Sequence, residues 1–431
     1  MTSVVHAAGK VGLDPYARID AISEEVSRSP AAFSSLLASE PRIVGAESWA
    51  ALQKKYDVIR SWQQTSLKLL AASIRDEIPR TIASALLDHL PDRFGWRHHA
   101  PPDWQSISPP LFFRTDQAAD GPVLEVQCPG SLSGVHEIVH AYYSEAGFDC
   151  ARKNKPLSAL FAETLRSHLG RRPVIHHLLD NSSHPAGERF FIQRVRPGAA
   201  YFGFDKDVRP QDCNFIRAHD FFALLTENFA AERLARWADG TCVYDLPPVA
   251  LFDQKLLLAF PFWDETRRYF GDDSRSLFPY TTVLAPQGVR LETGDWTTLE
   301  QFAALSPSKR RYFLKYAGAD VARNWGSRAV FRLDTDTSDA CLARLRAAVE
   351  QYEAGERWII QRECSSDENV SYFAREGEIR SNSARSKHSA IYGPAGMMAA
   401  LVMFETFFKV HMSAQTIVTV LFPANRAPGA N

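Results

Sequence analysis

The sequence has little cysteine, little net charge and no long apolar run. Its six cysteines form no C-x-x-C pair, which favours free thiols in a cytoplasmic setting over a disulfide framework. A formal net charge of −1 gives no sign of a nucleic-acid surface. The most apolar stretch, residues 397–410, is shorter than a membrane span and contains Glu405. We therefore expect a buried core helix there and no membrane segment, and residues 1–20 show no signal peptide.

What the chain does contain is a mixture of helical and strand patterns. At 431 residues it is long enough for two or three lobes. Residues 14–95 carry apolar side chains at helical steps, which predicts a helical N-terminal region. Further on, runs of both types alternate, and this mixture predicts an α+β (α/β) protein.

Particular elements can be assigned after residue 110. The runs 111–116 and 122–127 flank an Asp-Gly turn and predict a β-hairpin. Helical patterns cover 131–147 and 157–169. Beyond these, the patterns predict strands at 174–180, 190–195, 310–318 and 358–364, and helices at 219–237, around Lys255, and after residue 337.

The motif H-E-x-x-H occurs once, at His136, Glu137 and His140. On a helix its two histidines share a face and can bind one Zn²⁺, while the glutamate activates water. A catalytic zinc needs a third protein ligand, and Glu163 on the following helix is the candidate. The alternative is an ordinary core helix with both histidines on its flank. We prefer that interpretation and keep an HExxH zinc metallohydrolase as the alternative function.

The predicted hairpin carries four polar residues at alternate positions. Arg114 and Asp116 lie on its first strand, and Glu125 and Gln127 on its second. Residues two apart on a strand share a face, so these four can converge on one surface. Two carboxylates and an amide oxygen are ligands that suit Mg²⁺, and an arginine beside them can hold a phosphate. A solvated cluster of cross-strand charges is the structural alternative.

Here the chain resembles a family. An R-x-D strand followed by an E-x-N strand is similar to the magnesium signature of ATP-grasp ligases, especially glutathionylspermidine synthase and its circularly permuted relatives. Arg114, Asp116 and Glu125 match this signature, and Gln127 stands where asparagine is usual. In the permuted order the magnesium strands come early and the ATP lysines come late, as they do in this sequence.

The later half of the chain extends the resemblance. It offers two lysines, a glycine-containing loop, a hinge strand and a closing basic segment in the family's order. The residues expected to bind the nucleotide are Lys255, Lys315, Gly318, Gly326, Gln361, Glu363, Arg385 and Lys387.

The resemblance implies a circularly permuted ATP-grasp fold with an N-terminal helical region at 1–105. A magnesium and substrate part would follow at 106–250, and the ATP-binding lysine lobes and closing segment at 251–431. It implies an ATP-dependent carboxylate–amine ligase that forms an amide through an acyl phosphate. ATP and Mg²⁺ would be its cofactors, and a small-molecule carboxylate and amine its substrates. A non-ligase ATP-grasp protein, such as a phosphotransferase, is a further alternative.

The resemblance also implies roles for the hairpin residues. Asp116, Glu125 and Gln127 would hold Mg²⁺. Arg114 would be the catalytic residue that stabilises the transferring phosphoryl group. In this interpretation the histidines of the H-E-x-x-H motif have packing roles.

Overall fold

The computed structural model describes most of the chain. The described residues are 14–27, 34–87, 109–119, 121–127, 132–170, 172–178, 185–195, 200–202, 212–218, 232, 235–237, 239–245, 254–318, 320, 323, 328–352, 355–364, 367–406 and 413–424. Gly326 and most of the helix expected at 219–237 lie outside them. Within these ranges no helix is long and apolar enough to cross a membrane.

The N-terminal region is mainly helical, with helices α1 (Pro15–Ser27), α2 (Ala46–Ile74) and α3 (Arg80–Leu87). Helix α2 covers the predicted apolar pattern and buries its inner face at three- and four-residue steps. Two short strands, β1 (Leu36–Ala38) and β2 (Arg42–Val44), pair with the last strand of the chain. The region expected to be helical therefore also contributes to a sheet.

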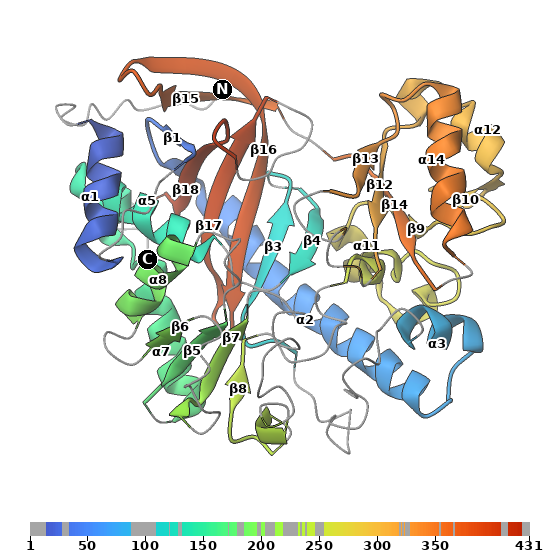
Figure 1. The fold of residues 1–431 in the computed structure, drawn as a ribbon, viewed down its shortest axis with the longest axis horizontal. Helices are drawn as coiled ribbons and strands as arrows, with labels where there is room; N and C mark the ends of the chain where they lie inside the picture. Colours follow the sequence, from blue (N-terminus) through green and yellow to red (C-terminus); the bar gives the residue numbers. More distant parts are fainter. Residues whose placement is uncertain are drawn as a thin grey trace.

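An eight-stranded mixed sheet forms the centre of the molecule (Figure 1). Its strand order is β15-β1-β18-β17-β16-β3-β4, and β2 pairs with β18 beside this path. The remaining strands are β3 (Phe113–Gln117), β4 (Val123–Gln127), β15 (Asp367–Phe373), β16 (Ile379–Gly393), β17 (Gly396–Glu405) and β18 (Ile417–Pro423). The predicted hairpin thus forms one edge of this sheet, beside the long strand β16.

The helix expected at 397–410 is wrong, because residues 396–405 form strand β17. Val402 and Phe404 pack into the core that includes α2, whereas Leu401 and Met403 pack into the core that includes α1 and helix α5 (Ser133–Glu145). The strand is therefore buried on both faces, with helices covering each side of the sheet (Figure 1). Burial on two faces removes the polar alternation that marks a strand, so the run resembles a buried helix in sequence.

Four helices follow the hairpin: α5 (Ser133–Glu145), α6 (Asp149–Lys153), α7 (Leu157–Leu169) and α8 (Pro185–Val195). Helices α5 and α7 confirm the predictions for these segments. The strand expected at 190–195 is wrong, since these residues are the second half of α8. Phe190 packs into one core, and Phe191 and Ile192 pack into another, so three consecutive residues are apolar and the short run resembles a buried strand in sequence.

Among the described residues, two four-stranded sheets and a two-stranded sheet of β10 (Val289–Arg290) and β11 (Trp296–Thr297) accompany the large sheet. Strands β5 (Ile175–Leu178), β6 (Ala200–Phe202), β7 (Phe215–Ala218) and β8 (Val243–Tyr244) form a parallel sheet in the order β6-β5-β7-β8. Strand β5 confirms the strand expected there.

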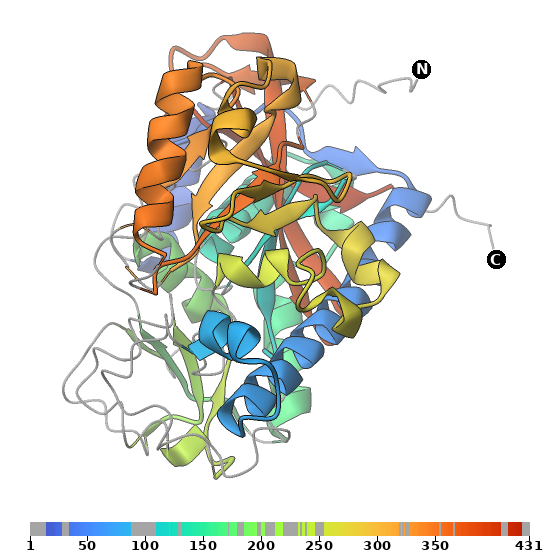
Figure 2. The same ribbon diagram turned by 90° about the vertical axis from the view of Figure 1, so that its right-hand side faces the viewer.

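The second small sheet is antiparallel, in the order β13-β12-β14-β9. Its strands are β9 (Thr281–Val283), β12 (Tyr312–Tyr316), β13 (Val330–Arg332) and β14 (Trp358–Arg362), and helices α12 (Leu299–Ala303) and α14 (Ser338–Glu350) belong to the same lobe (Figure 2). A short 3₁₀ helix, η5 (Lys255–Ala259), contacts β4, β9 and β14 and so connects this lobe with the large sheet. The helix expected around Lys255 is this single turn. The domain boundaries near 105 and 250 stay a prediction.

Candidate functional site

The hairpin brings its four polar residues into two facing pairs. Arg114 lies opposite Gln127, and Asp116 lies opposite Glu125, in the antiparallel register of β3 and β4. Directly opposed residues on neighbouring strands share a face. Arg114, Asp116 and Gln127 are each buried, so the solvated cluster of charges considered as the structural alternative does not describe them.

Asp116 is the centre of the first half of the site. Its Oδ2 accepts from Lys387 Nζ at 2.7 Å, and its Oδ1 accepts from Ser389 Oγ at 2.9 Å. The guanidinium of Arg114 lies 3.8 Å away. Burial opposes ionisation of this carboxyl, but Lys387 and Arg114 outweigh it and lower its pKa to about 2. Asp116 is therefore a fixed negative charge at neutral pH.

Glu125 is the centre of the second half. Its carboxylate pairs with Lys255 Nζ at 2.9 Å, at the start of η5. Burial again opposes ionisation, and Lys255 and Lys315 hold the pKa of Glu125 below its ordinary value. Lys315 reaches the site from β12, in the small antiparallel sheet, and donates to Gln361 Oε1 at 2.5 Å. Cations from two lobes thus face one carboxylate.

Gln361 holds the two sheets together at this point. Its side-chain amide donates to the Leu124 carbonyl at 3.3 Å in the large sheet and to Thr281 Oγ1 at 3.2 Å in the small one. The residue is buried, and its oxygen accepts from Lys315. Gln361 therefore positions Lys315 over the hairpin.

Positive charge exceeds negative charge in this cluster. Three lysines and Arg114 surround two carboxylates. Burial and the neighbouring cations Lys255 and Lys387 lower the pKa of Lys315 to about 8, although Glu125 and Asp116 act in the opposite direction. This excess of positive charge around Lys315 favours an anion at the site.

Glu363, which was expected to bind the nucleotide, pairs with arginine side chains in this structure. Its side chain is buried and accepts from Arg385 Nη1 at 2.7 Å and Arg311 Nε at 3.0 Å. Arg332 lies 3.4 Å from the same carboxylate. Glu363 thus gathers three arginines, one from the large sheet and two from the small lobe. Its expected contact with a nucleotide, and that of Arg385, stays a prediction.

Two glycines were expected in the loop over the phosphates. Gly318 follows β12 and is buried, and a side chain there would collide with Tyr316 and Glu356. Gly326 lies outside the described residues. The expected role of this loop therefore stays a prediction.

The H-E-x-x-H helix is α5, and its motif is more buried than expected. His136, Glu137 and His140 are all buried rather than lying on an exposed flank. Glu137 accepts from the Ser158 hydroxyl at 2.6 Å and from its backbone N–H at 3.1 Å. The proposed third ligand, Glu163, pairs instead with a lysine at the surface. Among the described residues, no three metal-binding side chains are grouped as a zinc site would require.

Two residues of the site were missed in the sequence. Ser389 lies opposite Asp116 in the register of β16 and β3 and donates to it. It follows Lys387 by two positions, and this strand spacing is a signal that could have identified it. Thr281 accepts from Gln361 across the small sheet, and nothing in the local sequence marks it.

The residues present fit a magnesium–triphosphate group in chemical type. The facing carboxylates Asp116 and Glu125 supply the hard oxygens that Mg²⁺ prefers. Three lysines and an arginine supply the positive charge that phosphate oxygens need. The Gln127 side-chain N–H donates to Asp116 Oδ2 at 3.4 Å, and the amide oxygen of Gln127 is a third oxygen of the type that Mg²⁺ binds.

The comparisons with known proteins give distant structural matches alone. No family model and no curated protein matches the sequence. Among solved structures, a glutathione synthetase-like effector from Globodera pallida matches with 13% identity and a TM-score of 0.48. The match covers 97% of this chain and 100% of that chain. At this distance the likeness adds nothing to the argument from the residues.

Proposed function

We propose that the protein is an ATP-dependent carboxylate–amine ligase with a circularly permuted ATP-grasp fold. The observation that carries this proposal is the convergence of Lys255, Lys315 and Lys387 on the facing carboxylates Asp116 and Glu125. These three lysines come from η5, β12 and β16, which belong to different parts of the fold. Such a set can bind a polyphosphate and a divalent cation together.

The proposed reaction has two steps. A substrate carboxylate attacks the γ-phosphate of ATP, which gives an acyl phosphate and releases ADP. An amine then attacks the acyl carbon, and phosphate leaves as the amide forms. ATP and Mg²⁺ supply the phosphoryl group and the charge that neutralises its oxygens when they are bound.

The chain's own residues position and stabilise these groups. Lys255 and Lys387, which pair with Glu125 and Asp116, exchange these partners for phosphate oxygens when a nucleotide enters. The carboxylates are then available as oxygen ligands for the cation. Arg114, buried beside Asp116, stabilises charge on the phosphoryl group as it transfers.

Buried polar groups gather at the start of α5. Its Ser133 hydroxyl accepts from Arg217 at 2.6 Å, and the Gly134 N–H donates to Glu188 at 3.0 Å. Burial raises the pKa of Glu188, while Arg217 and Arg114 act to lower it. Polar groups from α5, α8 and β7 therefore lie near Arg114, where the carboxylate and amine would meet.

Amide formation is tested by following ADP and phosphate release with pools of carboxylates and amines. The proposal expects release that needs Mg²⁺ and both substrates, with a product heavier by the joined amine in mass spectra. Lys315→Met should abolish the release of ADP and phosphate. Lys309→Met should leave this release unchanged, because Lys309 is an exposed residue on the same lobe. Nucleotide binding without any amide product would instead identify the non-ligase ATP-grasp alternative.

A further inference from the structure

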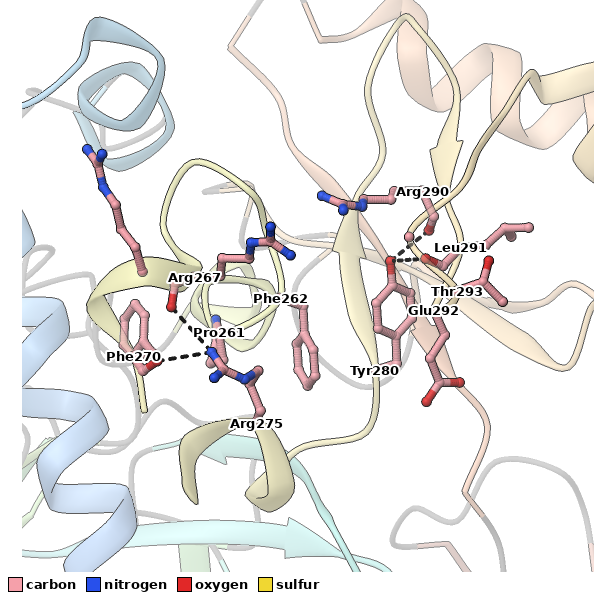
Figure 3. A pocket seen from close by; sticks show the side chains of 12 residues that line it. Pro261, Phe262, Arg267, Phe270, Arg275, Tyr280, Arg290, Leu291, Glu292 and Thr293 are labelled. Atoms are coloured by element: carbon pink, nitrogen blue, oxygen red, sulfur yellow. Dashed lines mark hydrogen bonds between the residues drawn. The ribbon is translucent and has the colours of Figure 1, made fainter. Parts of the chain in front are cut away.

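A second site lies on the lobe of the small antiparallel sheet. A cavity of about 760 Å³ opens between residues 261–275, Tyr280 and the turn 290–294 (Figure 3). Its volume falls in the range of pockets for small organic ligands. None of the lysines and carboxylates described above lines it. The cavity therefore needs an explanation separate from the proposed nucleotide site.

Four arginines line this cavity, and they share few carboxylates. Asp264 pairs with both Arg267, at 3.3 Å, and Arg290. Arg275 pairs with Asp272. One carboxylate thus serves two guanidinium groups, so neither group has its charge fully compensated.

The fourth arginine has no carboxylate partner among the described residues. Arg268 donates to the Tyr269 hydroxyl at 2.9 Å, and its guanidinium lies 4.9 Å from that ring. The acidic residue in the lining, Glu292, is occupied by Arg362 at 2.6 Å. Four guanidinium groups therefore face two available carboxylates. The excess of positive charge favours an anion in the cavity.

An aromatic surface adjoins these charges. The rings of Phe262 and Tyr280 lie side by side, with centroids 5.4 Å apart and an angle of 69° between their planes (Figure 3). The Tyr280 hydroxyl donates to the carbonyls of Arg290 and Leu291 at 2.9 and 3.0 Å. These hydrogen bonds turn the polar end of Tyr280 toward the backbone. Its ring therefore remains as an apolar surface for a ligand.

We propose that this cavity binds a small organic anion in which a phosphate or carboxylate group is attached to a ring. Guanidinium groups bind both kinds of oxyanion through paired hydrogen bonds. The ring of the ligand packs against Phe262 and Tyr280, while its anionic group faces Arg267 and Arg290, which lie on either side of Asp264. The site is separate from the lysine cluster and does not depend on the ligase proposal.

Calorimetric titration of the full chain tests this proposal. The probes are phenyl phosphate, phthalate, inorganic phosphate and benzyl alcohol. The double variant Arg267→Gln/Arg268→Gln removes two positive charges from the cavity lining. Neither arginine is buried, so the double variant should fold. Arg346→Gln is the matched control, because Arg346 is similarly exposed and lies on α14 outside the cavity. Lys315→Met reports whether a probe occupies the lysine cluster instead.

The expected result is saturable binding of phenyl phosphate or phthalate, and the tighter of the two identifies the anionic group. The ring should make the better probe about threefold to tenfold tighter than inorganic phosphate, and benzyl alcohol should not bind. The double variant should weaken binding at least about tenfold, whereas Arg346→Gln and Lys315→Met should leave it unchanged. Absence of binding up to about 10 mM would overturn the proposal. Binding lost in Lys315→Met but kept in the double variant would also overturn it.

Discussion

Replacement of Lys315 by methionine should make the unliganded protein more stable. Burial and cationic neighbours lower the pKa of Lys315 from 10.5 to about 8. A fall of that size corresponds to about 3 kcal/mol of unfavourable free energy for the charged form. The residue is partly accessible to solvent, so we reduce this to about 2 kcal/mol. Loss of the hydrogen bond to Gln361 costs about 1 kcal/mol, which leaves a gain of about 1 kcal/mol at neutral pH.

The stability difference between Lys315→Met and the wild-type protein should depend on pH. Lys315 binds its proton more weakly in the folded chain than in the unfolded chain, so wild-type stability rises as pH increases above 8. The variant lacks this group and does not share the rise. The advantage of Lys315→Met should therefore be largest near pH 7 and should shrink by about 1 kcal/mol or more toward pH 9.5.

Urea denaturation at the two pH values measures both effects. An exposed lysine, Lys309, provides the control, and Lys309→Met should change stability by less than about 0.5 kcal/mol. A Lys315→Met protein that is less stable than wild type at pH 7 would refute the reasoning. So would a difference between the two proteins that does not vary with pH.

Two further predictions concern stability. Burial lowers the pKa of His136 to about 3 and of His140 and His388 to about 4, so the unfolded chain takes up protons first as pH falls below 6.5. Each of these three histidines should therefore lower the free energy of unfolding by on the order of 2 kcal/mol between pH 7 and pH 5. Urea denaturation at the two pH values measures the loss, and an unchanged midpoint would contradict the prediction. Gly134→Ala places a Cβ against the backbone of α8 and should lower stability by roughly 1–3 kcal/mol. Gly45→Ala, where a Cβ meets nothing within 4 Å, is its control in the same thermal melt.

Sequence patterns predicted the elements that have one polar face. Helix α2 and helix α7 each expose one side, so their apolar residues recur at helical steps and their bounds could be assigned. Strand β17 and the second half of α8 are buried on more than one side. The sequence of β17 is almost uniformly apolar, and Phe190, Phe191 and Ile192 in α8 are consecutive apolar residues. In such runs periodicity cannot separate a strand from a helix.

The candidate site shows a similar division. The convergence of the four polar hairpin residues could be predicted, because residues two apart on a strand share a face. The ion pair of Lys387 with Asp116 joins residues 271 positions apart and depends on β16 lying beside β3. The gathering of three arginines around Glu363 likewise depends on two lobes meeting. Pairings of this kind arise from topology, which local patterns do not encode.

The central claim is that Lys255, Lys315 and Lys387 form a magnesium–nucleotide site with Asp116 and Glu125. The most direct test is the melting temperature with Mg²⁺ and a non-hydrolysable ATP analogue, added separately and together. At a hundredfold excess over Kd the pair should stabilise the fold by about 2.7 kcal/mol, a rise of several degrees. Lys315→Met and Asp116→Ala should lose this rise, and Lys309→Met should keep it. No rise in the wild-type protein, or an equal rise in Lys315→Met, would contradict the account.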